Sequence, residues 1–427
     1  MKRIQPLKGT RDFYPEQKRV LNFIINTWEK VAKRYGYEDF DGPMLEPAQL
    51  WQMKSGQEIP EQMYVFEDKG GRVVAVRPEL TPTLARMIAQ KSMELSKPIK
   101  WYSTARCWRY EAPQTGRLRE FFQFNIDCLG TDNMLADAEV VATAITIMQE
   151  FGCDKSDFYI RLCNRKLIQA VLESFQIKKI PEVMRIIDKK DKVSEKNFKE
   201  MLKEYKLSES QIKDVLEMTT WTDLYKAKKL SLSEEGKKGL EELEELMKYL
   251  KAMKLDGFVK IDFSIMRGFD YYTSTVFEVF DQRKKFRAIA GGGRYDDLVK
   301  DFGSREKVSG VGYGMGDVVL ELFLKEIKKL PEISREIDYF VAYMKPELVE
   351  EFLPYMEELR KKFSVDLDLM HRGFNKQMSH ANKVGAKKTI ILAPKEWEKG
   401  EIIIKDMKTG KQEVKNLKRF LREDHQG

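Results

Sequence analysis

The sequence predicts an α+β fold divided among several domains, and three observations support this prediction. Residues 106–130 contain two strand-like runs joined by a turn, residues 163–256 are charged and helical in pattern, and residues 335–427 alternate strand and helix patterns. A length of 427 residues implies two or three domains and a hydrophobic core large enough to fold without disulfide bonds.

The first part, residues 1–162, is predicted to contain a helix at 16–35, then strands, a hairpin, and an amphipathic helix at 137–151. The hairpin is its most informative element. Aromatic residues on both sides of it alternate with polar residues: Trp108, Tyr110, Phe122 and Phe124. A period of two is typical of strands, and the sequence PQTGR at 113–117 has the composition of a turn. We therefore expect an antiparallel hairpin.

The charges of this hairpin suggest a nucleotide ligand. Four arginines offer planar, permanently charged donors to phosphate oxygens: Arg106, Arg109, Arg117 and Arg119. Glu111 and Asp127 can accept hydrogen bonds from a base or from an ammonium group. The alternative is a salt-bridged surface hairpin, because charge-rich hairpins are common on protein surfaces.

A second segment rich in polar groups lies at residues 265–280. It places four such residues just ahead of a β-branched, aromatic strand: Arg267, Asp270, Tyr271 and Tyr272. A glycine triplet follows at 291–293, and glycines allow a ligand or a neighbouring strand to approach the backbone closely. The triplet matches neither the Rossmann fingerprint nor the P-loop motif, so neither cofactor site is indicated. Taken alone, the triplet is better explained as a β-bulge.

The remaining segments differ in composition. Residues 163–256 contain charged helical runs such as KNFKEMLKEYKL, which indicates an inserted helical domain; the alternative is a helical linker whose lysines and glutamates form a solvated face. Strands return the chain to the core within residues 257–328. The polar stretch KEIKKLPEISRE then marks a linker, and residues 335–427 have the alternating pattern of a small α/β domain.

Composition excludes several classes of protein. The four cysteines show no C-x-x-C spacing, so a zinc site is not expected and reduced thiols are the default. No apolar run approaches the roughly 20 residues of a membrane span, and the start of the chain lacks the apolar core of a signal peptide. These features predict a soluble, cytoplasmic protein. The net charge of +8 favours a polyanionic partner only mildly.

Histidine usage restricts the chemistry. The three histidines are His371, His380 and His425, so residues 1–370 contain no Ser-His-Asp triad, no H-E-x-x-H site and no imidazole base. Chemistry in that region depends on carboxylates, arginines, tyrosines and a bound metal. Adenylation suits such a site, because attack of a carboxylate on an α-phosphorus needs positioning and charge neutralisation more than proton transfer.

Together these segments resemble the class II aminoacyl-tRNA synthetases, and within them the histidyl-tRNA synthetases. The hairpin resembles motif 2 of that class, and RGFDYY at Arg267 with GGGRYDDL at Gly291 resembles the histidine-specific signatures. Four further stretches match: KGTRDFYPE at Lys8, GYEDFDGPMLEP at Gly36 with the motif 1 proline Pro43, VRPELTPTLAR at Val76, and GVGYGMGDVVL at Gly310 as motif 3. The resemblance covers nearly the whole chain.

The resemblance implies a fold and partners. The catalytic core, residues 1–162 and 257–328, is expected to be a mixed, mainly antiparallel sheet flanked by helices. Residues 163–256 correspond to an insertion domain that contacts the tRNA acceptor arm, and 335–427 to a C-terminal α/β anticodon-binding domain. The implied substrates are L-histidine, ATP and tRNA(His), with Mg²⁺ bound by residues that the sequence does not identify. Motif 1 implies a homodimer.

The resemblance also assigns roles to individual residues. Histidine is expected to be bound by Glu79, Thr81 and Gln123 at its ammonium group, and by Asp127 and Tyr272 at its imidazole, with Tyr271 supporting the pocket. ATP is expected to contact Arg109, Arg267, Glu111 and Phe121. The two arginines would hold the α-phosphate and act in catalysis with Gln123, while Phe121 would stack on adenine; the alternative for Phe121 is an ordinary core position. Arg117 and Arg119 would meet the acceptor end of tRNA.

Motif 3 departs from the family pattern. The usual G-x-G-x-E-R carries an arginine that binds the nucleotide, but this chain has Val318 and Val319 at the last two positions. The resemblance is therefore to an archaeal-like variant of the motif. Arg294 or Arg287 could supply the missing charge, or Mg²⁺ alone could hold the outer phosphates.

The function expected from these features is histidine–tRNA ligation. The main alternative is a catalytically silent, histidine-binding relative of the ATP phosphoribosyltransferase regulatory subunit type. Such subunits typically lack the C-terminal domain and parts of the arginine clamps, whereas residues 335–427, Arg109 and Arg267 are present here. A bare RNA-binding module would explain neither Glu79 nor the RGFDYY signature. The same signature, and the absence of cysteine and histidine zinc ligands, disfavours a synthetase for threonine or proline.

Overall fold

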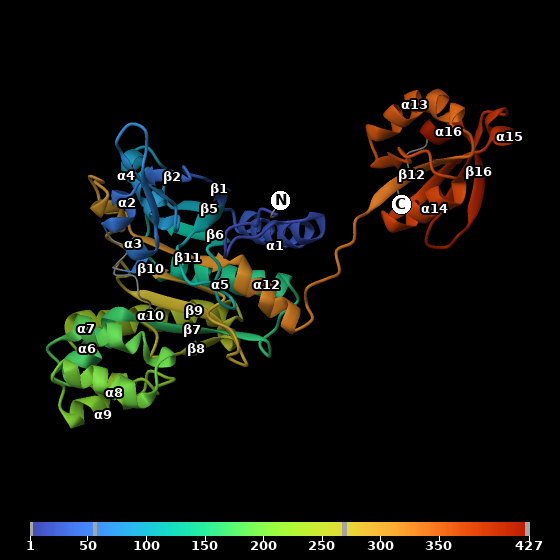
Figure 1. The fold of residues 1–427 in the computed structure, drawn as a ribbon. Coiled ribbons are helices and arrows are strands. Elements are labelled where there is room, and N and C mark those ends of the chain that lie inside the picture. Colours follow the sequence, from blue (N-terminus) through green and yellow to red (C-terminus); the bar gives the residue numbers. More distant parts are fainter. Residues whose placement is uncertain (1–2, 54–57, 267–270, 423–427) are drawn as a thin grey trace. The chain divides into compact units, whose positions relative to one another are not determined.

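The computed structural model describes residues 3–53, 58–266 and 271–422. The chain divides into two compact units, residues 1–331 and 332–427 (Figure 1).

An eight-stranded sheet forms the centre of the first unit, in the order β1-β5-β6-β11-β10-β9-β7-β8. The β1–β5 and β7–β8 pairs are parallel and the other five pairs are antiparallel. The mixed, mainly antiparallel sheet expected from the sequence is therefore confirmed. The strands are β1 (Glu38–Asp39), β5 (Ile99–Trp108), β6 (Glu120–Leu129), β7 (Phe158–Asn164), β8 (Val259–Ile261), β9 (Thr275–Asp281), β10 (Ala290–Arg294) and β11 (Gly310–Gly316).

Two long helices pack against this sheet. α1 (Pro15–Arg34) starts with proline in its first turn and ends with Lys33 and Arg34, so its terminal charges complement the helix dipole. α5 (Met134–Glu150) begins at Asn133, whose side chain accepts a hydrogen bond from the Leu135 amide at 2.8 Å. The other helices of the core are α4 (Thr81–Lys91), α11 (Leu298–Asp301) and α12 (Asp317–Glu326).

A small three-stranded sheet, in the order β2-β4-β3, precedes α4. Its inner side packs on a separate hydrophobic cluster that includes Trp51, Ile59 and Ala75. The elements are β2 (Leu45–Pro47), α2 (Gln49–Gln52), α3 (Glu58–Gln62), β3 (Tyr64–Glu67) and β4 (Val73–Val76).

Between β7 and β8 the chain forms helices and turns. α10 packs closely on α6 because it carries glycines at the contact: a Cβ atom at Gly236 would lie 2.2 Å from Ala170 Cβ, and one at Gly239 would lie 2.7 Å from Asn164 Oδ1. The elements are α6 (Arg165–Ser174), α7 (Ile180–Ile187), η1 (Lys190–Lys192), α8 (Glu195–Glu204), α9 (Glu209–Met218), η2 (Ala227–Lys229), α10 (Glu234–Ala252) and η3 (Asp256–Phe258).

The second unit is a five-stranded sheet, in the order β13-β12-β14-β15-β16, with helices on both faces. Along β12, Tyr339 and Val341 belong to one hydrophobic cluster while Phe340 and Ala342 belong to another, so this strand is buried on both sides. The elements are β12 (Ile337–Tyr343), α13 (Glu347–Arg360), β13 (Val365–Leu367), α14 (Phe374–Lys383), β14 (Ala386–Leu392), α15 (Pro394–Trp397), β15 (Glu401–Asp406), β16 (Gln412–Asn416) and α16 (Leu417–Arg422).

Cys107, Cys128, Cys153 and Cys163 are all buried and free. Among the described residues, no helix is both long and apolar enough to cross a membrane. The described residues also contain no group of three or more histidine, cysteine, aspartate or glutamate side chains arranged to hold a metal ion.

Candidate active site

A cavity of about 750 Å³ opens on one face of the large sheet. The alternation of β6 determines which side chains face it. Gln123, Asn125 and Asp127 line the cavity, while Phe122 and Phe124 belong to the buried core on the opposite face. The hairpin therefore contributes a row of three polar side chains to this wall.

Glycines on the neighbouring strand leave room for this row. In the register of β6 and β11, Gly312 is paired with Asp127 and Gly314 with Asn125. A Cβ atom at Gly312 would lie 2.0 Å from Asp127 Oδ1, and one at Gly314 would lie 2.7 Å from Gln123 Nε2. The glycine-rich composition of the motif 3 strand is thus required by the side chains that cross it.

The side chain of Asp127 has one oxygen that can accept a hydrogen bond from a ligand. Its side chain is buried, and Tyr295 Oη donates a hydrogen bond to its Oδ1 atom. Its Oδ2 atom is also buried but has no hydrogen-bond partner among the described residues. Burial raises the pKa of Asp127 to about 7, and the hydrogen bond from Tyr295 opposes that rise. A ligand N–H group at this position would satisfy the unpaired oxygen.

Further acceptors surround Asp127. Glu79 and Thr81, at the start of α4, are buried and line the same cavity. Gln123 Nε2 donates to Asn125 Oδ1 at 2.9 Å, which leaves Gln123 Oε1 as an acceptor. The structure therefore brings together the predicted ammonium ligands and the predicted imidazole ligand.

Tyrosines form another wall. The rings of Tyr271 and Tyr272 have centroids 4.7 Å apart, and those of Tyr271 and Tyr295 are 6.1 Å apart in an edge-to-face arrangement. Gly293 allows this packing, because a Cβ atom there would lie 2.9 Å from Tyr272 Cδ1. Arg267 and Asp270, which the same signature contains, lie outside the described residues.

Arg109 lines this cavity and also a smaller one, and an aromatic ring lies beside it. The guanidinium carbon of Arg109 lies 5.2 Å from the centre of the Phe121 ring, and Arg109 Nε donates to the Pro78 carbonyl at 3.0 Å. Phe121 is only partly buried and borders a smaller cavity of about 130 Å³, which also includes Val318 and Val319 in its wall. Phe121 thus borders a cavity and also packs against the hydrophobic core.

The two arginines predicted to contact tRNA interact with other residues of the hairpin. Arg117 forms an ion pair with Glu111. Arg119 Nε donates to the Glu111 carbonyl at 3.0 Å, and its guanidinium carbon lies 4.1 Å from the centre of the Tyr110 ring. Glu111 therefore lies at the centre of these contacts.

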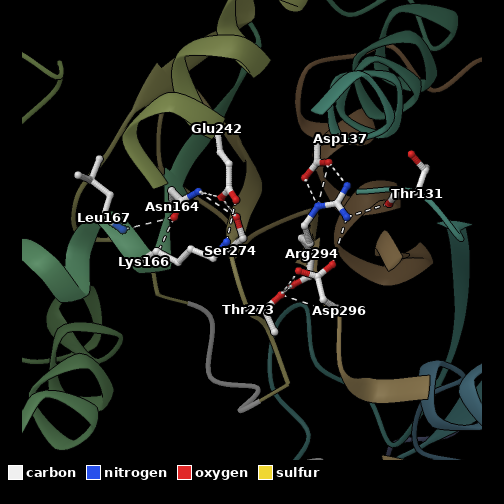
Figure 2. A network of polar contacts seen from close by, with 10 residues as sticks. All are labelled: Thr131, Asp137, Asn164, Lys166, Leu167, Glu242, Thr273, Ser274, Arg294 and Asp296. Carbon is white, nitrogen blue, oxygen red and sulfur yellow. Dashed lines mark hydrogen bonds and ion pairs between the residues drawn. The ribbon is translucent and has the colours of Figure 1, made fainter. Parts of the chain in front are cut away.

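Arg294 cannot supply the charge that motif 3 lacks, because its guanidinium is already paired. It is fully buried and forms an ion pair with Asp137, while its Nη1 atom donates to the Thr131 carbonyl at 3.0 Å and to Asp296 at 3.1 Å (Figure 2). Arg287, in contrast, lines both the main cavity and the smaller one.

The segment after the tyrosines is fixed from two sides. Thr273 Oγ1 donates to Asp296 at 3.1 Å, whereas the next residue, Ser274, donates to Glu242 of α10 (Figure 2). Glu242 also accepts from Asn164 at 2.9 Å and from Lys166 at 2.7 Å. Helix α10 thus holds the segment that leads from the tyrosines into β9.

Three residues of the site carried no role in the sequence prediction. Asn125 could have been found from its alternation with Gln123 and Asp127, and Tyr295 belongs to a signature that was noted for its glycines and arginine. Arg161 had no sequence signal. It lines the cavity and donates to Asp262 and Asp191, both at 2.7 Å.

The fold, with polar side chains lining the main cavity and Arg109 lying beside the Phe121 ring, is that of a class II aminoacyl-tRNA synthetase. Residues 9–317 match the family described as Histidyl-tRNA synthetase, and residues 338–423 match the Anticodon binding domain family. The chain belongs to the histidyl-tRNA synthetase family, and the family and fold predicted from the sequence are confirmed.

Relatives support the same assignment. The histidine–tRNA ligase of Haloarcula marismortui is 37% identical over 420 residues, covering 95% of this chain and 94% of that protein. That of Thermoplasma volcanium is 36% identical over 423 residues, covering 97% and 96%. Among solved structures, histidyl-tRNA synthetase from Nostoc sp. PCC 7120 has a TM-score of 0.81 at 26% identity, covering 98% of this chain and 100% of that one.

One structural neighbour bears on the alternative function. A protein from Bacillus halodurans C, named as an ATP phosphoribosyltransferase regulatory subunit/histidyl-tRNA synthetase, has a TM-score of 0.75 at 21% identity, covering 91% of this chain and 98% of that one. This likeness shows the shared fold alone. The family match and the named relatives favour the ligase over the regulatory alternative.

Proposed function

We propose that this chain is a histidine–tRNA ligase, which activates L-histidine with ATP to histidyl-adenylate and pyrophosphate and then transfers histidine to the 3′ end of tRNA(His). One observation carries the proposal: the Asp127 Oδ2 atom, which has no hydrogen-bond partner within the described part of the chain, belongs to the same cavity as Arg109. The Asp127 carboxylate can thus accept a hydrogen bond from the imidazole of histidine. Arg109 can bind a phosphate of ATP in the same cavity.

The histidine end of the cavity suits both polar ends of the amino acid. The ammonium group would be held by Glu79, Thr81 and Gln123, because a cation needs several acceptors. The imidazole would donate to Asp127, with Tyr272 and Tyr271 enclosing the ring. This leaves the carboxylate of histidine directed toward the nucleotide.

In the activation step the histidine carboxylate attacks the α-phosphorus and pyrophosphate leaves. Arg109 would stabilise the charge on the α-phosphate, together with Arg267, which lies outside the described residues, and Gln123 would orient the carboxylate. Phe121 would stack on adenine beside Glu111. No step needs an imidazole base, which agrees with the absence of histidine before residue 371.

Mg²⁺ would assist by neutralising the phosphates. This ion usually binds through one or two carboxylates plus phosphate oxygens, so it does not need a site built entirely from protein groups. Glu278 on β9 lines the main cavity and is a suitable carboxylate. The hard oxygen donors of the phosphates would complete its coordination.

The rest of the chain would serve tRNA. The C-terminal unit would bind the anticodon, and Arg117 and Arg119 on the hairpin loop would meet the acceptor end with the inserted helical segment. Backbone phosphates are held mainly by arginine and lysine. Four buried, free cysteines suit a reducing compartment such as the cytoplasm.

A homodimer would form through the small sheet near motif 1. In the register of β2, β4 and β3, the row Pro47, Val74 and Phe66 and the residue Leu45 share one face. Leu45 and Phe66 are 49% and 46% exposed, which is unusual for large apolar side chains on one face of a sheet. A second copy of the chain would cover this face.

The test is ATP–pyrophosphate exchange with the purified protein and Mg²⁺. We expect exchange that depends on L-histidine and fails with other amino acids, followed by charging of tRNA(His). Histidine binding without exchange would favour the regulatory alternative. Exchange with threonine or proline would reject the substrate assignment.

A further inference from the structure

We infer that Asp317 positions the adenine site: its carboxylate fixes strand β6 beside Phe121, the ring proposed to stack on adenine, and Arg11 holds that carboxylate in place. The inference rests on the proposed function, because it names a residue that acts through Phe121 on the ATP of that reaction. It follows from the contact of Asp317 with β6, from its ion pair, and from the residues that border the same cavity as Phe121.

Asp317 continues the contact between β11 and β6 beyond the end of their pairing. The register of the two strands ends where Gly316 is paired with Gln123. The next amide of β6 toward the hairpin loop is that of Phe122, and it donates to Asp317 Oδ1 at 2.8 Å. This amide belongs to the peptide bond between Phe121 and Phe122, so the hydrogen bond fixes the backbone at Phe121 directly.

A cation from the beginning of the chain holds Asp317. The Asp317 side chain is fully buried, and Arg11 Nη2 donates to its Oδ2 atom at 2.6 Å. The two carboxylate oxygens therefore have different partners, one on β6 and one on the N-terminal segment. A buried carboxylate without a cation beside it is costly to keep ionised, and the ion pair with Arg11 offsets that cost.

The segment that carries Arg11 is itself fixed on the same end of β6. The Gly9 carbonyl accepts from the amide of Glu120, the first residue of β6, at 3.2 Å. The guanidinium carbon of Arg11 lies 4.8 Å from the centre of the Phe13 ring. The Phe13 ring in turn lies edge-to-face with the Phe122 ring, with centroids 6.1 Å apart. The cation that holds the carboxylate is thus anchored on the strand that the carboxylate contacts.

The neighbours of Asp317 in sequence border the same cavity as Phe121. Gly316, Val318 and Val319 line the smaller cavity of about 130 Å³ together with Phe121. Asp317 is buried and lines neither this cavity nor the main one. Asp317 is therefore a positioning residue, and its effect on ATP passes through the Phe121 ring.

The experiment compares Asp317→Ala with the wild-type chain in histidine-dependent ATP–pyrophosphate exchange. Loss of the acceptor for the Phe122 amide should raise the KM for ATP about 10-fold, the order of magnitude of one hydrogen bond to a charged group. Inhibition by adenosine, which has the base but no phosphate, should weaken by the same factor. The KM for pyrophosphate, which has no base, should stay unchanged. The KM for histidine should change little, because Gln123 remains paired with Gly316.

Two neutral pairs separate the hydrogen bond from the ion pair. Arg11→Met with Asp317→Asn leaves no buried charge without a partner, and the asparagine Oδ1 atom can still accept from the Phe122 amide. Arg11→Met with Asp317→Leu is similar in volume but has no acceptor. The asparagine pair should have a KM for ATP near that of the wild type, and the leucine pair should show the 10-fold rise. This comparison holds even if Asp317→Ala, which leaves Arg11 without its partner, does not fold.

A double-mutant cycle tests the route through the ring. Phe121→Ala should raise the KM for ATP, and adding Asp317→Ala should raise it no further, because the ring through which Asp317 acts is then absent. Glu321→Ala is the matched control: Glu321 lies one turn further along α12 and pairs with Lys325 of the same helix. It should leave the KM for ATP unchanged.

Four results would overturn the inference. These are an unchanged KM for ATP in folded Asp317→Ala, an equal rise in the KM values for ATP and pyrophosphate, a further rise when Asp317→Ala is added to Phe121→Ala, and equal KM values for ATP in the two neutral pairs. Absence of exchange in the wild-type chain would instead reject the proposed function, so the two failures are distinguishable.

Discussion

The buried carboxylate of Asp127, which is proposed to bind the imidazole of histidine, lowers the stability of the free protein. It has one carboxylate oxygen bonded to Tyr295 and one without a partner among the described residues, in a buried position. Keeping this group ionised near neutral pH is unfavourable in the free protein, because burial penalises the charge. The same cost is what makes the group a strong acceptor for a ligand N–H.

Replacing this carboxylate should stabilise the free protein. The pKa of Asp127 is raised to about 7 in the folded chain, so its proton is bound more tightly there than in the unfolded chain. Well below the pKa of the unfolded chain, Asp127 is protonated in both states, so its burial does not reduce the free energy of unfolding. The reduction grows as pH rises toward 7. At pH values above 7, Asp127→Asn should increase the free energy of unfolding by up to about 4 kcal/mol and raise the melting temperature accordingly.

Thermal unfolding of both chains between pH 4 and pH 8 checks this expectation. The stability difference should vanish toward pH 4, and the variant should lose most histidine-dependent exchange. Tyr295→Phe serves as a comparison, because it removes the donor to Asp127 while leaving the carboxylate. A variant less stable than wild type at pH 8 would contradict the assigned cost.

At the scale of elements, the periodicity of the sequence predicted the strands well, but it did not predict which side chains contact each other across the fold. The strands of the hairpin were expected from alternation, and β5 and β6 are found there; Tyr110, however, lies beyond the end of β5 and is exposed. The sequence could not decide between Arg294 and Arg287. The structure excludes Arg294 because it forms a buried ion pair with Asp137, a residue 157 positions away.

The contact between α10 and the segment after the tyrosines can be tested by mutation. Glu242 accepts from Ser274, which lies two residues after Tyr272, and the helix that carries Glu242 packs on α6 through Gly236 and Gly239. Glu242→Ala should loosen the start of β9 and raise the KM for histidine several-fold. The KM for ATP should change less, because the residues proposed to bind ATP lie on other elements.

Steady-state exchange kinetics with each substrate varied in turn measure this split. Glu241→Ala is the control, since Glu241 is exposed on the neighbouring position of the same helix. Circular dichroism should show unchanged helix content in both variants. Equal effects on the two KM values would indicate general destabilisation rather than positioning of the histidine wall.

At the scale of the whole molecule, each unit has its own hydrophobic core. If the second unit binds the anticodon, removing residues 332–427 should reduce aminoacylation far more than histidine activation, because activation needs only the cavity of the first unit. Each lost phosphate contact should reduce the slope of log affinity against log salt by roughly 0.7 to 0.9. Equal loss of both reactions would mean that the first unit needs the second in order to fold.

The exposed apolar face of the small sheet leads to the last prediction. Phe66 is 46% exposed on a face shared with Leu45, and burying such a face between two copies would remove apolar surface from water on both. A charge at its centre would be buried without a partner in that interface, so Phe66→Glu should shift the chain from dimer to monomer. Light scattering at micromolar concentration measures the change. Val414→Glu, an exposed position on β16 of the second unit, should leave the dimer intact. A wild-type monomer, or a Phe66→Glu variant that remains fully dimeric, would show that this face does not join the two copies.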